Sequence, residues 1–151
     1  LCSLDYSNEN EIEFQFSGAQ NPVWIVRKAT DPNLVVNGIE IEPNLTLGER
    51  KLFEVKGTKQ PIGYFEGSQP FDLSTSVLKK GDVIYLFTDG FADQFGGEKG
   101  KKFKYKTLKE LILSSQRTAV SEQKEIFHDA FYDWKRDMEQ VDDICLMGVE
   151  V

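Results

Sequence analysis

The sequence predicts an α+β fold with mostly antiparallel strands, and three observations support this fold class. Short apolar or alternating runs, separated by turn residues, fill the first half of the chain. Two helix-like segments follow in the second half, and one further apolar run closes the sequence. Strands first, then helices, then a last strand is the order of an α+β domain rather than of repeated βαβ units.

The first half consists of candidate strands that are joined by turns. Residues 1–6 and 12–16 flank a turn at 7–10 and form the first expected hairpin. Residues 34–41 form a second hairpin around Asn37-Gly38, because Asn-Gly suits a turn with positive φ angles. Further strands are expected at 23–26, at 52–55 and within 71–78.

The second half contains a fully apolar strand and two helices. Residues 83–87 are five consecutive apolar residues, which suits a strand that is covered on both faces. Thr107 and Glu110 match a capping box that would open a helix over 108–115. A second helix is expected from Ser121 onward, with an apolar stripe that faces the core.

Composition bounds the architecture and excludes several classes of function. The 151 residues are the length of one domain, and 40% hydrophobic with 28% charged residues is typical of a folded globular chain. No apolar run approaches the roughly 20 residues that cross a bilayer. The net charge of −7 argues against nucleic acid as a partner.

Two local features qualify this composition. Cys2 and Cys145 lie in apolar, strand-like runs, so we expect both to be buried, reduced thiols, which favours a cytoplasmic location. Residues 99–106 contain five lysines in an otherwise acidic chain. This segment is either a solvated loop or a surface that attracts an acidic or phosphorylated partner.

Two acidic motifs next to apolar strands are the candidate metal ligands. Asp89 follows the strand at 83–87, whereas Asp142 and Asp143 precede the closing strand. If these strands pair antiparallel, the carboxylates converge on one edge of the sheet, and Gly90 allows close backbone approach to a metal or phosphate. Carboxylates without imidazole or thiolate favour Mg²⁺ or Mn²⁺. The alternative is an ordinary Asp-Gly turn and an Asp-Asp strand cap.

Four motifs in order along the chain resemble those of SpoIIE-type members of the type 2C protein phosphatase superfamily. Residues 81–90, Gly-Asp-Val-Ile-Tyr-Leu-Phe-Thr-Asp-Gly, together with Asp93, resemble the family signature around its Asp-Gly pair. Residues 141–146 resemble its closing Asp-Asp motif, with Cys145 where the family has Thr. Residues 17–22 and 61–63 resemble two of its turns.

The resemblance implies an α/β-β/α sandwich, of which this chain would hold a part: a mostly antiparallel sheet sandwich with helices packed on it. It implies hydrolysis of phosphoserine or phosphothreonine at a two-metal Mn²⁺ or Mg²⁺ site. Asp89 and Asp143 would be metal ligands, supported by Gly90, Asp93 and Asp142. In the family, the substrate is often a phosphorylated anti-anti-sigma-like protein, and an upstream sensor module, sometimes membrane-anchored, controls a cytoplasmic domain.

Residues 1–151 are therefore expected to be one domain, the C-terminal portion of such a phosphatase domain, because the family's first metal motif has no counterpart here. We expect the parent domain to be active, this fragment alone to be inactive, and the fragment to form a homodimer. The alternative is a non-catalytic partner-binding or regulatory module with a degenerate phosphatase fold. A haloacid-dehalogenase-type site is disfavoured because it needs an Asp where Phe91 stands.

Overall fold

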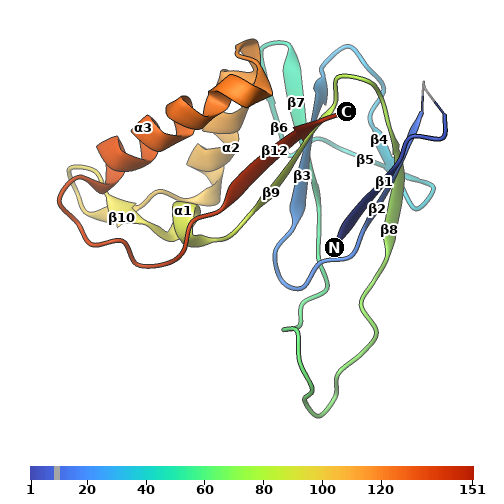
Figure 1. Cartoon of the computed structure of the whole chain (residues 1–151), viewed down its shortest axis with the longest axis horizontal. Coiled ribbons are helices and arrows are strands. Elements are labelled where there is room, and N and C mark those ends of the chain that lie inside the picture. The colour runs from blue at the N-terminus through green and yellow to red at the C-terminus, as the bar shows by residue number, and fades with distance from the viewer. Residues whose placement is uncertain (9–10) are drawn as a thin grey trace.

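The computed structural model describes residues 1–8 and 11–151 and contains two five-stranded antiparallel sheets (Figure 1). The first sheet has the order β1 (Cys2–Asp5), β2 (Ile12–Phe16), β8 (Ser74–Leu78), β4 (Leu34–Val36) and β5 (Ile39–Ile41). The second has the order β12 (Leu146–Glu150), β9 (Val83–Phe87), β3 (Val23–Lys28), β7 (Arg50–Val55) and β6 (Leu45–Leu47). The predicted α+β class with antiparallel pairing is confirmed.

The helical part follows β9 and lies on one side of the second sheet (Figure 1). It comprises α1 (Gly90–Asp93), the small hairpin β10 (Phe95–Gly96) and β11 (Lys101–Lys102), α2 (Tyr105–Ser114), the 3-10 turns Ser115–Arg117 and Val120–Glu122, and α3 (Gln123–Lys135). No helix among the described residues is long and apolar enough to span a bilayer.

Strand β3 shows why the second sheet forms the middle layer. Trp24 and Val26 face the helices in one core cluster, whereas Val23 and Ile25 face the first sheet in another. All four side chains are fully buried, so a continuous apolar run here reflects burial on both faces. The first sheet instead alternates buried and exposed residues, and its outer face is open to solvent.

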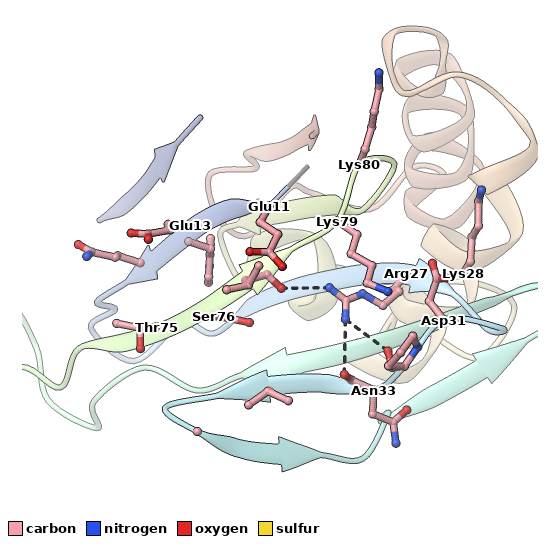
Figure 2. A pocket seen from close by; sticks show the side chains of 16 residues that line it. Glu11, Glu13, Arg27, Lys28, Asp31, Asn33, Thr75, Ser76, Lys79 and Lys80 are labelled. Carbon is pink, nitrogen blue, oxygen red and sulfur yellow. Dashed lines mark hydrogen bonds between the residues drawn. The ribbon is translucent and has the colours of Figure 1, made fainter. Parts of the chain in front are cut away.

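A buried ion pair joins the two sheets. Arg27 on β3 donates hydrogen bonds to both carboxylate oxygens of Asp82, at 2.6 to 3.1 Å, and to the carbonyl of Val77 on β8. Asp82 also accepts a hydrogen bond from the Lys79 backbone N–H. Figure 2 shows the Arg27 guanidinium at the base of a hollow on the outer face of the first sheet. Asp82, at the start of the signature motif, therefore serves to hold the two sheets together.

Both predicted hairpins are present. Strands β1 and β2 pair in register, although the expected turn at 7–10 lies partly outside the described residues. Asn37 and Gly38 have φ angles of 50° and 79°, as the second hairpin requires. Strand β6 and the β10–β11 hairpin are additional to the strands that the sequence predicts.

Two local predictions are wrong. Helix α2 begins at Tyr105 with Lys104 as its N-cap, so Thr107 lies inside the helix and forms no capping box. The reason is tertiary, because the Lys104 N–H is bonded to the carbonyl of Ala92 and fixes the start earlier. Both cysteines are free, but Cys145 is exposed and Cys2 only half-buried, since each lies on or beside an edge strand.

Candidate functional site

Residues of all four sequence motifs lie at one end of the two sheets, whereas the Gly81-Asp82 start of the longest motif lies at the other end. In the first sheet, Phe16 pairs with Ser74 at this end. In the second sheet, the pairs Val23–Val55 and Phe87–Leu146 mark the same end. A bridge between Ala19 and Thr58 joins two of the loops that leave the sheets there. We call the segments 17–22, 56–73, 88–94 and 139–145 the motif rim, which runs from the lower left to the bottom of Figure 1.

Thr88 fastens the two acidic motifs to each other. Its hydroxyl donates a hydrogen bond of 2.8 Å to the Asp143 carbonyl and accepts one of 2.9 Å from the Cys145 N–H. Its own N–H donates to the Cys145 carbonyl at 3.0 Å. The antiparallel pairing of β9 and β12 thus continues into the loops that carry Asp89 and Asp143.

Gly90 brings the two motifs into van der Waals contact. A β-carbon at this position would lie 2.4 Å from the Asp143 carbonyl oxygen, closer than any side chain tolerates. The sequence suggests that Gly90 allows backbone approach to a metal or phosphate. The structure gives a packing reason for the glycine, because the residue lets α1 start directly against the closing motif.

Asp89 and Asp143 carry free carboxylates where β9 ends and β12 begins. Both are exposed, and Asp89 precedes α1 without using its side chain as a helix cap. Neither carboxylate has a hydrogen-bond or ion-pair partner among the described residues. Two uncommitted carboxylates at one sheet edge suit a hard divalent cation, which commonly keeps several waters besides its protein ligands.

The predicted supporting acids are engaged locally. The Asp142 carboxylate accepts a hydrogen bond of 2.7 Å from the Asp143 N–H and so shapes the turn before β12. Asp93 lies one turn after Asp89 and forms an ion pair of 3.0 Å with Lys102, in which both side chains are nearly half exposed. Asp142 and Asp93 therefore have structural roles next to Asp143 and Asp89, respectively.

A separate group of potential metal ligands lies on α3. Glu125, His128 and Asp129 place one ligand atom each within 4.8 Å of one another, and all three are exposed. In the described part of the chain, the rim carboxylates form no comparable group of three. The α3 group contains no residue of the sequence motifs, and exposed acidic groups of this kind are common without an ion.

Tyr105 is a rim neighbour that sequence reasoning missed. It opens α2, and its ring contacts Trp24 and Phe87 with centroids 5.9 and 6.0 Å apart. Burial raises the pKa of Tyr105, and the negative charges of Asp89, Asp93 and Glu54 raise it further. Tyr105 therefore keeps its proton beside the acidic edge. Only the tertiary fold reveals this, since no motif includes the residue.

The comparisons with known proteins agree with this arrangement. The family described as Stage II sporulation protein E (SpoIIE) matches residues 18–151. Among solved structures, the chain is similar to the "SiaA-PP2C domain of Pseudomonas aeruginosa", with a TM-score of 0.67 and 22% identity. The match covers 95% of this chain and 47% of that chain, so this chain spans about half of its length. Comparison with curated proteins gives no match.

Proposed function

Because this chain belongs to the SpoIIE family, we propose that it forms part of a metal-dependent domain that hydrolyses phosphoserine or phosphothreonine in a regulatory phosphoprotein. Membership of the family supports a phosphatase-type function. The observation that supports metal-dependent hydrolysis is the contact between the two acidic motifs. In this contact, Thr88 and Gly90 hold the Asp143 segment against the Asp89 segment.

Asp89 and Asp143 would hold Mn²⁺ or Mg²⁺ through their free carboxylates. When bound, such ions lower the pKa of a coordinated water and neutralise charge on a phosphoryl group. Thr88 keeps the two motif backbones in register, and Asp142 orders the turn that presents Asp143. Tyr105 offers a neutral hydroxyl next to the acidic edge, as a hydrogen-bond donor to a phosphoryl oxygen.

The chain alone is proposed to be inactive. Among the described residues, Asp89 and Asp143 belong to no group of three ligand atoms that lie within 4.8 Å of one another, which predicts weak retention of a metal pair. The full domain is proposed to supply the missing ligand. We further propose a cytoplasmic setting, control by an upstream sensor module and an anti-anti-sigma-like phosphoprotein as substrate, which all rest on the family.

A second candidate is a non-catalytic partner-binding or regulatory module with the same fold. In the part of the chain that the structure describes, neither Asp89 nor Asp143 belongs to a close group of three ligand atoms. This favours the alternative, because a two-metal site normally needs more ligands than these two residues provide. Turnover by the parent domain separates the two candidates, since a binding module would bind a phosphoprotein without releasing phosphate.

The experiment compares this chain with its parent domain, using p-nitrophenyl phosphate and a phosphoserine peptide with Mn²⁺. We expect phosphate release by the parent domain and negligible release by the chain. In the parent domain, Asp89→Asn or Asp143→Asn should lower kcat by about 10² or more, the scale of losing a key electrostatic group. The control Asp129→Asn, on the polar face of α3, should leave kcat unchanged.

Two results would contradict the proposal. Turnover by the isolated chain at the rate of the parent domain would show that no further ligand is needed. An active parent domain whose Asp89→Asn and Asp143→Asn variants keep full activity would remove these residues from the site.

A further inference from the structure

Residues 99–106 form a basic surface beside the acidic rim, and we call them the lysine hairpin. They contain Lys99, Lys101, Lys102, Lys104 and Lys106 in a chain whose net charge is −7. All five lysines are exposed. Lys101 and Lys102 form strand β11, which pairs antiparallel with β10, and Lys106 lies in the first turn of α2.

The fold anchors this hairpin firmly. Phe103 is buried, and its ring centroid lies 5.0 Å from that of Phe91 and 5.4 Å from that of Trp134. The Phe103 N–H donates to the Gln94 carbonyl, and the Lys104 N–H donates to the Ala92 carbonyl. A freely solvated loop has no need of such anchoring, so the lysines are held in a defined position.

That position is next to the candidate metal ligands. Lys102 pairs with Asp93, whose N–H donates to the Asp89 carbonyl. Tyr105 lies between Lys104 and Lys106 of the hairpin, close enough to Asp89 for the negative charge of Asp89 to raise the Tyr105 pKa. The ion pair between Lys102 and Asp93 therefore connects the lysine hairpin to the segment that carries Asp89.

Three lysines of the hairpin have unpaired charges. Lys99, Lys101 and Lys104 have no acidic partner within ion-pair distance among the described residues, whereas Lys102 and Lys106 each face one. Lys104 also has φ 76° and ψ 148°, a backbone conformation that is strained for every residue except glycine. A lysine at this position costs stability and adds a cation at the edge of the rim.

We propose that the lysine hairpin binds an acidic segment that flanks the phosphorylated residue of the protein substrate, a proposal that rests on the proposed function. A phosphorylated, acidic protein would be repelled by the net charge of the chain and by the free carboxylates of the rim. A fixed row of lysines beside Asp89 offsets this repulsion and orients the segment so that its phosphoester faces the rim.

The test measures peptide binding to this chain by fluorescence anisotropy. One labelled peptide carries a phosphoserine flanked by glutamates, and the other carries the same phosphoserine flanked by alanines. The acidic peptide should bind more tightly, and its affinity should fall as salt rises from about 50 to about 300 mM, because salt screens exposed charges.

Matched charge reversals locate the effect. Lys99→Glu with Lys101→Glu should weaken binding of the acidic peptide about tenfold, because each exposed charge pair contributes modestly. Lys28→Glu with Lys80→Glu makes the same change of net charge at the opposite end of the sheets, and it should leave affinity nearly unchanged. If both double variants lost affinity equally, net charge alone would explain the effect, and the proposal would be overturned.

A second variant separates weaker binding from loss of folding. Lys104→Gly removes one charge but relieves the positive φ angle, so it should be at least as heat-stable as the original chain and still bind less tightly. Unchanged affinity in Lys104→Gly and in the hairpin double variant would also overturn the proposal.

Two further measurements distinguish a peptide ligand from a lipid surface, and binding from hydrolysis. Hairpin-dependent binding to phosphatidylserine vesicles, without binding to the acidic peptide, would assign the surface to membranes and refute the proposal. Hairpin-dependent binding of the acidic peptide, in a parent domain that releases no phosphate, would refute the proposed hydrolysis but retain the acidic ligand.

Discussion

Thr88 is the residue through which the two acidic motifs depend on each other. One hydroxyl group both donates to Asp143 and accepts from Cys145, so it links the loop after β9 to the loop before β12. A side chain of the same size without a hydroxyl would leave the Cys145 N–H and the Asp143 carbonyl without these partners.

Thr88→Val should therefore destabilise the chain by about 0.5–1.5 kcal/mol, the net contribution of a typical hydrogen bond, because the groups that lose their partner are exposed to water. Thr88→Ser keeps the hydroxyl and should lose much less. Urea unfolding of the three proteins measures the difference. A Thr88→Val variant as stable as the original chain would show that the link contributes nothing.

The sequence identified the candidate ligands but not the residues that hold them. Asp89, Asp143 and Gly90 stand in motifs whose spacing is local and therefore readable. The role of Thr88 depends on the pairing of β9 with β12, and that of Tyr105 depends on how α2 packs on the second sheet. Neither arrangement produces a periodic pattern in the sequence.

At the scale of elements, Glu54 ties α2 to the second sheet. Its carboxylate on β7 accepts hydrogen bonds from Lys109 on α2 at 2.8 Å and from the Trp24 indole on β3 at 3.0 Å. Burial alone would raise the pKa of Glu54, but these hydrogen bonds and nearby lysine charges outweigh it and lower the pKa below the usual value of a glutamate.

A lowered pKa in the folded state makes this tie sensitive to acid. The stabilisation by Glu54 is fully present above the unfolded-state pKa and is lost as pH falls through the folded-state pKa. The difference in free energy of unfolding between the original chain and Glu54→Gln should therefore shrink as the pH is lowered below about 4.3, the usual pKa of a glutamate.

Denaturant unfolding from neutral to acidic pH checks this prediction. Glu110→Gln is the control, because Glu110 is exposed and faces Lys106 only at 4.0 Å. A difference between the original chain and Glu54→Gln that stays constant or grows in acid would contradict the assigned tie.

The elements that sequence reasoning missed are the short ones and those with tertiary causes. Strand β6 has three residues and β10 has two, so no alternation can be read from them. The start of α2 is set by the contact of Lys104 with Ala92 rather than by a capping pattern. Cys145 lies in an apolar run yet is exposed, because β12 is an edge strand.

At the scale of the whole molecule, the helices cover one side of the second sheet, and the first sheet has an open outer face (Figure 1). Val35 and Val77 on this face are 45% and 47% exposed. Each sheet also ends in strands with unpaired backbone groups, and such edges template pairing with another chain.

We expect the chain to associate with a second copy through this face or its edge strands. Light scattering over a concentration series should show a dimer, and Val35→Glu with Val77→Glu should shift it toward monomer. Lys124→Glu on α3 makes the same change of net charge away from this face and is the control. The net charge of −7 opposes association, and a chain that stays strictly monomeric at high concentration would contradict the expectation.

The function of the domain depends on whether Asp89 and Asp143 form a divalent-metal site at the motif rim. Paramagnetic broadening of backbone amide NMR signals during Mn²⁺ titration tests this assignment directly, because it reports even weak binding. We predict selective broadening of residues 88–93 and 142–145, and its loss in Asp89→Asn with Asp143→Asn. Broadening centred instead on Glu125, His128 and Asp129 of α3, or unchanged in the double variant, would contradict the assignment.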